Sequence, residues 1–173
     1  MGNVSERRKQ PPQVGVSVVI LALGPVPQSD VGAGAASSGM GSTLWMPLVK
    51  RVRQPFFGAM ALPGGGLRAD HSLEQSAYAA LESTTSLHPK YLEQLYTFGD
   101  PARSHGGLPM VSIVYWALVG EADGRIDFAG GDNVKWFPVN HLPELAFDHR
   151  TIVEYAMNRL RGKIESPDIA TRL

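Results

Sequence analysis

ALPGGGLRADHSLEQSAYAALESTTSL, residues 61–87, joins a glycine-rich turn to an amphipathic helix, and the rest of the chain is interpreted from it. Pro63 fixes φ and the three following glycines permit positive φ, so 62–66 is predicted as a tight turn without regular structure. Ser72 is a suitable N-cap, and Ser86-Leu87-His88-Pro89 ends the predicted helix. Residues at helical intervals share one side of this helix: Leu73, Ala77, Ala80, Leu81 and Thr84.

A glycine turn ahead of a helix N-terminus is compatible with a phosphate-binding loop and equally with a plain loop-to-helix corner. Three cations, Lys50, Arg51 and Arg53, stand just before it. Arginine pairs with phosphate oxygens through two parallel hydrogen bonds, so Arg51 and Arg53 are candidate anion ligands, with plain solvation as the alternative.

The remaining sequence predicts strands and one further helix. Residues 1–13 are expected to form a flexible tail, and 24–42 a Gly- and Ser-rich loop. β-Branched and alternating patterns predict strands at 14–23, 43–49, 91–98, 110–119 and 133–139, with 126–128 briefly extended. A second helix is predicted at about 149–164, because apolar residues recur there at helical intervals and form a stripe, and 166–173 forms a short extension. The order predicts a single α+β domain at 14–165, built on a mixed sheet between helices.

Composition narrows the function. The 173 residues are 43% apolar and 18% charged with a formal net charge of zero, which is typical of a soluble globular domain and not of a nucleic-acid-binding surface. Cysteine is absent, which is compatible with a cytoplasmic protein. No apolar run approaches the roughly 18 residues of a membrane-spanning helix, so no membrane partner is expected.

Aligned on Gly65, the opening stretch resembles the Nudix box, whose pattern is glycine-x5-Glu-x7-Arg-Glu-apolar-x-Glu-Glu-x-Gly-apolar. Leu81 and Leu87 occupy the two apolar positions. The polar positions of the box differ throughout, being His71, Ala79, Ala80, Ser83, Thr84 and Ser86 in this chain. In the family the carboxylates hold Mg²⁺ or Mn²⁺ against a diphosphate and help activate water, and such hard cations prefer carboxylate oxygens. We therefore expect neither catalytic residues nor a metal cofactor here.

The resemblance extends over most of the chain. LEQLYTFGDPARS (92–104), VSIVYWALV (111–119) and the segment 134–165 with its LAFDH resemble the Nudix branch of ADP-ribose pyrophosphatases and Nudix-related transcriptional regulators of NAD metabolism. The resemblance implies a Nudix fold, a homodimer and binding of ADP-ribose or a related NAD-derived nucleotide. In the regulators a C-terminal winged helix binds DNA. That module would start about where 166–173 stops, so DNA is an expected partner only through a segment outside this chain.

The resemblance also implies site residues. The diphosphate would meet Gly64, Gly65 and Gly66 and the helix N-terminus, assisted by Arg51, Arg53 and Arg103. Arg103 would otherwise be a solvated loop cation. Phe147 would stack on adenine or pack as a staple before the helix, and His149 would contact ligand or serve structure. Asp148 is a candidate N-cap of the last helix.

Two alternatives to a nucleotide sensor stay open. The first is a Nudix hydrolase with a metal site rebuilt from Asp70, Glu74 or Glu82, which would require Mg²⁺ or Mn²⁺. Against it, Glu82 is expected to point away from the helix side shared by Ala80, Ser83 and Thr84. The second is an interaction module whose pocket is closed by side chains.

Overall fold

The computed structural model describes residues 11–30, 41–104 and 107–165 of the chain. Among these residues one sheet is formed by β1 (Gln13–Pro25), β2 (Ser42–Lys50), β3 (Met60–Ala61), β4 (Gly64–Gly66), β5 (Glu93–Phe98), β6 (Met110–Val119) and β7 (Val134–Pro138). The helices are α1 (Leu73–Thr84) and α2 (His149–Glu165), with short 3-10 turns at η2 (Gln28–Asp30), η3 (Pro101–Ser104), η4 (Glu121–Asp123) and η5 (Val139–His141). None of the helices in this part of the chain is long and apolar enough to cross a membrane.

The five predicted strands and both predicted helices are confirmed. Residues 126–128 are not a strand: the Asp127 carboxylate accepts from the Ala129 N–H, and the Asp127 carbonyl accepts from Gly130, which closes a turn. β1 begins at Gln13, the last residue of the predicted tail, whereas 1–10 and the extension 166–173 lie outside the described residues.

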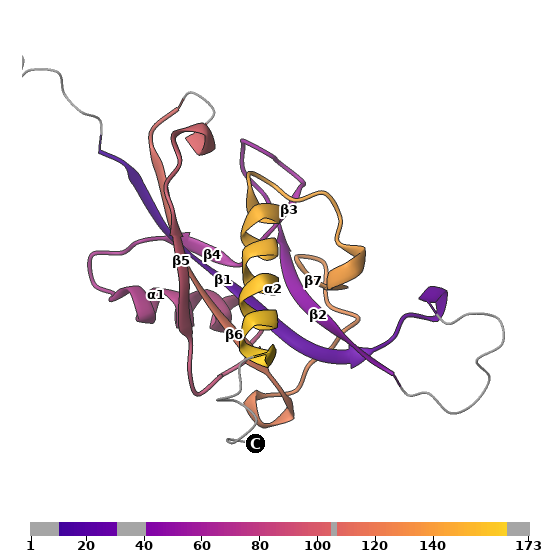
Figure 1. Cartoon of the computed structure of the whole chain (residues 1–173). Coiled ribbons are helices and arrows are strands. Elements are labelled where there is room, and N and C mark those ends of the chain that lie inside the picture. Colours follow the sequence, from indigo (N-terminus) through magenta and orange to yellow (C-terminus); the bar gives the residue numbers. More distant parts are fainter. Residues whose placement is uncertain (1–10, 31–40, 105–106, 166–173) are drawn as a thin grey trace, which may run out of the picture.

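β1 is the central strand of the sheet (Figure 1). It pairs in parallel with β6 from Gln13 to Ala22, and its C-terminal end pairs antiparallel with β2. Near its N-terminal end it also pairs antiparallel with β4. On its other side β2 pairs with β7, and the sheet order is β3-β2-β1-β6-β5. The sheet is therefore mixed, as predicted.

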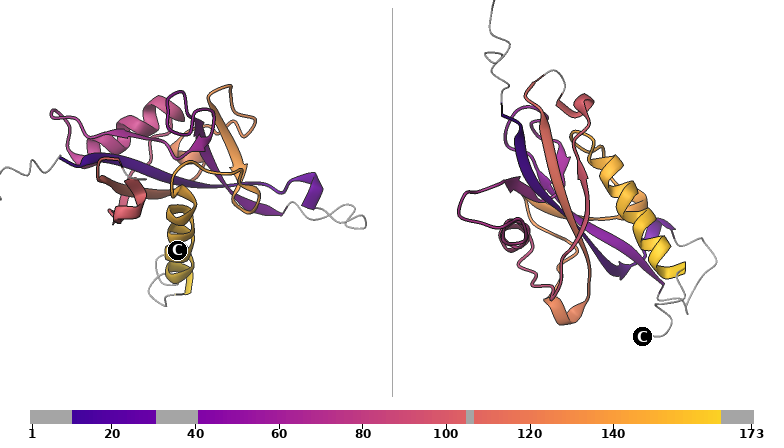
Figure 2. Two further views of the ribbon diagram at one scale, coloured as in Figure 1. Left: turned by 90° about the horizontal axis from the view of Figure 1, so that it is seen from above. Right: turned by 60° about the vertical axis from the view of Figure 1, so that its left-hand side comes forward.

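Each face of the sheet is covered by one helix, as Figure 2 shows in both views. Successive strand residues point to opposite faces. Val18 and Ile20 accordingly pack with Ala77 and Leu81 of α1, and Val19 and Leu21 pack in a second cluster with Ile152 and Ala156 of α2. This confirms the sandwich and the apolar stripes predicted for the two helices.

The capping of α1 is also as predicted at its start. Ser72 Oγ accepts from the Gln75 N–H at 3.0 Å, and Gln75 Oε1 accepts from the Ser72 N–H at 2.8 Å, which forms a reciprocal capping box. At the other end Ser86 has a φ of +56° and its N–H donates to Leu81 O at 3.2 Å. The Nudix pattern has glycine at this position, and a left-handed backbone of this kind favours glycine over the serine found here.

The segments that carry the predicted site residues are gathered at one end of the molecule. The β2–β3 connection, the start of β6 and the first turn of α2 lie together in the upper part of Figure 1. Residues far apart in sequence meet here because β1 and β6 run parallel and α2 starts at the same end.

Candidate functional site

A cavity of about 690 Å³ lies between the start of β1, β4, the start of β6 and the corner before α2. All eight residues predicted as ligand contacts line it, although they come from four separate segments. They are Arg51, Arg53, Gly64, Gly65, Gly66, Arg103, Phe147 and His149. The fold therefore brings the predicted site together.

The glycine segment differs from its prediction. Gly64–Gly66 is strand β4, paired with Gly15–Ser17 of β1, and none of its glycines has positive φ. A Cβ on Gly64 would lie 2.6 Å from Val16 O, so the missing side chain serves close approach between strands. Gly65 and Gly66 would meet nothing within 4 Å. The exposed backbone of β4 thus forms one wall of the cavity.

The N-terminus of α1 lies outside the lining of this cavity, so its contact with the diphosphate stays a prediction. The lining of the cavity extends from β4 to Leu67 and includes none of the residues from Ser72 to Gln75. α1 begins seven residues after Gly66, because the segment between them forms its own turn, in which the His71 N–H donates to Arg68 O at 3.2 Å.

Arg51 closes the connection between β2 and β3. Its backbone bonds to Ala59 and Gly58, and its Nε donates to Pro55 O at 2.9 Å. Its guanidinium also lies over the ring of Phe147, 4.7 Å from the ring centroid. Arg53 is exposed on the same connection. No aspartate or glutamate occurs among the lining residues, so this cavity favours an anion.

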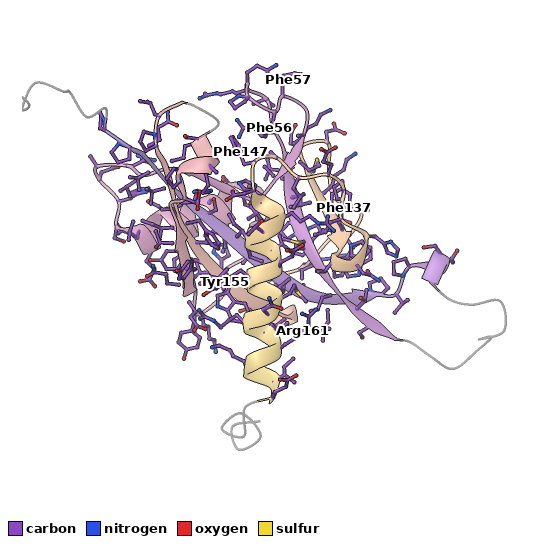
Figure 3. The ribbon with its side chains drawn as sticks, turned by 45° about the horizontal axis from the view of Figure 1, so that its top comes forward. Phe56, Phe57, Phe137, Phe147, Tyr155 and Arg161 are labelled. Carbon is purple, nitrogen blue, oxygen red and sulfur yellow. The ribbon has the colours of Figure 1, made fainter. Side chains whose placement is uncertain are left out.

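Aromatic rings gather at the mouth of the cavity. Phe147 packs against Phe56, with 4.8 Å between ring centroids, and against His149 at 5.6 Å. Figure 3 shows Phe56, Phe57 and Phe147 together beyond the first turn of α2. Phe57, which follows Phe56, is 65% exposed. Phe147 has a φ of +52°, a conformation that L residues rarely adopt.

Arg103 is not a solvated loop cation, because it is only 6% exposed. Its Nε and Nη2 donate to the two carboxylate oxygens of Asp148 at 2.7 and 3.1 Å. Nη1 donates to Phe98 O at 2.7 Å and to Met110 O at 3.2 Å, and Nη2 donates also to Ser112 Oγ at 2.9 Å. Asp148 precedes α2, as predicted for an N-cap, and both of its carboxylate oxygens accept from Arg103.

His149 is buried and neutral. Its Nδ1 accepts the N–H of Leu62 at 3.0 Å, which places the ring hydrogen on Nε2. Burial lowers its pKa to about 4; the Asp148 carboxylate opposes this shift, and the charges of Arg103 and Arg51 add to it. The hydrogen bond ties the first residue of α2 to the segment leading into β4.

Sequence reasoning missed two serines at the site, Ser17 and Ser112. Both are buried, both line the cavity, and Ser112 accepts from Arg103. Each is the single serine or threonine within a largely apolar strand, VGVSVVIL and MVSIVYWALV. A lone polar residue in such a run requires a hydrogen-bond partner, and this signal was available.

The metal expected in Nudix enzymes does not fit the residues present. In the part of the chain that the structure describes, no group of three or more His, Cys, Asp or Glu side chains could hold a metal ion. Asp70 pairs with Arg68 at 3.0 Å, and Glu82 pairs with His88 at 3.1 Å. Two of the three candidate substitutes are thus engaged elsewhere.

Comparison with known proteins supports these observations. No protein-family model matches the chain. It is 33% identical over 118 residues to an ADP-ribose pyrophosphatase of Methanocaldococcus jannaschii. The match covers 66% of this chain and 67% of the relative. It is 29% identical over 120 residues to the ADPR responsive transcriptional repressor NtrR of Acinetobacter baylyi, covering 67% of this chain and 48% of the repressor. The chain thus spans about half of that relative's length.

Among solved structures, the Nudix domain of Shewanella oneidensis NrtR in complex with ADP ribose superimposes with a TM-score of 0.64 at 32% identity. The match covers 87% of this chain and 90% of that domain. The same NrtR has also been solved with a 27mer DNA; there this chain covers 63% of the NrtR chain. By its fold, its box and these relatives, the chain belongs to the Nudix superfamily.

Proposed function

We propose that this domain binds ADP-ribose or a related NAD-derived nucleotide, as the sensor of a transcriptional regulator of NAD metabolism. The observation that carries the proposal is the cavity itself, whose lining holds no acid and three arginines, of which only Arg103 is paired with a carboxylate among the described residues, that of Asp148. A diphosphate is the ligand group that such a lining suits, since arginine pairs with phosphate through two hydrogen bonds. The relative solved with ADP ribose matches this chain over most of its length.

Arg51 and Arg53 are the two arginines of the lining that would pair with the diphosphate. Arg53 is exposed at the cavity, and Arg51 is half-buried there, its charge balanced by no acid in the lining. The exposed backbone of β4 faces the same space and lets a phosphate approach closely. Phe147 and the neighbouring Phe56 supply a flat apolar surface for the adenine.

We infer that this binding needs no divalent metal. In a Nudix enzyme the box carboxylates recruit the cation, and in this chain those positions hold His71, Ala80, Ser83 and Thr84. The diphosphate charge is then balanced by arginine alone. Hydrolysis is correspondingly absent or slow.

Calorimetric titration of ADP-ribose with either EDTA or Mg²⁺ present tests the proposal. We expect micromolar binding of equal strength in both buffers, and no AMP when the mixture is analysed by chromatography. Arg53→Gln should weaken binding roughly tenfold, the value of one charged hydrogen bond. Arg161→Gln, on the exposed side of α2 away from the cavity, is the matched control. Binding that requires Mg²⁺, or no binding at all, would contradict the proposal.

A metal-dependent ADP-ribose hydrolase is the second candidate. Its support is the 33% identity to the ADP-ribose pyrophosphatase of Methanocaldococcus jannaschii. It predicts AMP formation with Mg²⁺ or Mn²⁺, abolished by Glu82→Ala. Persistent activity in that variant would locate the metal elsewhere.

Homodimerisation and a link to DNA complete the regulator proposal. Light scattering of the purified chain tests the dimer. Where a DNA-binding module is attached, the ligand would alter DNA affinity only by binding one arrangement of the dimer better than another. A gel-shift titration with the complete regulator, with and without ADP-ribose, measures that difference.

A further inference from the structure

We propose that Arg103 is a positioning residue: it does not reach the nucleotide, but it holds the corner formed by Phe147, Asp148 and His149 in the arrangement that does. This rests on the proposed function, because the corner is taken to meet the ligand. It replaces the expectation, based on resemblance, that Arg103 contacts the diphosphate or ribose.

The guanidinium of Arg103 has no donor left for a ligand. Arginine carries five N–H donors, and five acceptor atoms are hydrogen-bonded to it. Its charge is balanced by the Asp148 carboxylate, and its side chain is 5% exposed. A phosphate oxygen would have to displace a buried acceptor, which would then lose its partner without gaining water.

The acceptor atoms on Phe98, Met110 and Ser112 lie at the two ends of the connection that carries Arg103, and those of Asp148 lie 45 residues further along the chain. Phe98 is the last residue of β5, Met110 and Ser112 begin β6, and Asp148 stands before α2. One side chain therefore fixes the start of α2 against the ends of two strands. A residue that served only to close its own loop would not bond to Asp148 as well.

The corner needs such a fastening because its backbone is strained. Phe147 has positive φ, and such conformations persist only when surrounding contacts determine them. Its ring is held by Phe56 and by the Arg51 guanidinium, and the next residue, Asp148, by Arg103. His149, which follows Asp148, is held by the hydrogen bond that its Nδ1 accepts from the Leu62 N–H. Phe147 is thereby presented to the cavity in one orientation.

Arg103→Lys is the test variant, because it keeps the charge but cannot reproduce the two-pronged bond to Asp148. Three probes separate the roles: ADP-ribose, inorganic pyrophosphate and adenosine, each titrated by NMR. We expect Arg103→Lys to weaken ADP-ribose and adenosine by the same factor, roughly tenfold, and pyrophosphate less than twofold. Arg53→Gln should weaken the binding of pyrophosphate and change that of adenosine less. Phe147→Leu should weaken the three probes in the same pattern as Arg103→Lys.

A readout without ligand makes the test independent of the proposed function. In Arg103→Lys the corner loosens and water reaches His149, so its NMR titration midpoint should rise from about 4 toward 6.5. Should Arg103→Lys not fold, Ser112→Ala removes a single acceptor and should give the same pattern with a smaller, two- to threefold effect.

The outcomes are distinct. Equal loss of pyrophosphate and ADP-ribose in Arg103→Lys would make Arg103 a phosphate ligand and overturn the inference, as would unchanged binding of all three probes. If the unmodified domain binds no ADP-ribose, the proposed function fails. The His149 titration then decides the positioning role: a raised midpoint supports it and an unchanged one overturns it.

Discussion

His149 makes the stability of the domain depend on acidity through one hydrogen bond. Its Nδ1 accepts the Leu62 N–H, which a protonated imidazole cannot do. The native state therefore binds this proton only near pH 4, whereas the unfolded chain binds it near pH 6.5. Between these values the unfolded state holds more protons, so stability is complete above about pH 6.5 and falls as the pH is lowered.

The size of the loss follows from the two pKa values. Protonation of the unfolded chain costs the native state about 1.4 kcal/mol at about pH 5.5 and about 2.6 kcal/mol at about pH 4.5. Below about pH 4 both states are protonated and the loss levels off near 3.4 kcal/mol. Against a typical domain stability of about 5–15 kcal/mol this is easily measured.

His149→Asn is the informative substitution. The amide oxygen of asparagine stands in for Nδ1 as acceptor but does not titrate. The variant should be less stable near neutrality by about 1–3 kcal/mol, because it fills less of the buried site. Its stability should then fall less steeply with acid than that of the unmodified domain.

Urea unfolding at several pH values between about 7.5 and 4.5 measures both curves. Carboxylates titrate in both proteins and cancel in the difference, so the gap between the two stabilities should narrow by about 2.6 kcal/mol over this range. Parallel curves would show that His149 titrates normally in the native state, and would refute the argument from burial.

Four further substitutions, in β4 and at the two ends of α1, can be measured by thermal and urea unfolding. Gly64→Ala should cost about 1–3 kcal/mol, because its Cβ would meet Val16 O at 2.6 Å, whereas the matched Gly65→Ala should stay within about 0.5 kcal/mol. Equal effects would mean that close strand approach is not what requires glycine. Ser86→Gly should stabilise the domain by about 1 kcal/mol by relieving its positive φ, and a loss would contradict this. Gln75→Ala should cost about 1 kcal/mol through loss of its capping-box hydrogen bond, and an unchanged midpoint would show that water replaces that bond.

Much of the molecule follows from local sequence. Alternation and β-branching predict five of the strands, and apolar spacing predicts both helices, because these patterns depend only on neighbours within one element. Ser72 caps α1, as the preference of serine for the N-cap position predicts. Leu81 and Leu87, the apolar positions of the box, are both buried. The eight residues named through the resemblance to the Nudix family all line one cavity, and their contact with a ligand stays a prediction.

The roles within the site were decided by tertiary structure. The glycines were expected to adopt positive φ. They form β4 instead, because β1 lies beside them and pairs with them. A run of glycines does not by itself indicate that it will pair with a strand. Arg103 was expected in solvent or on a ligand, and its acceptors instead come from β5, β6 and the α2 corner. A buried charged side chain must hydrogen-bond to the acceptors around it. Which acceptors these are is decided only when segments distant in sequence pack together and exclude water.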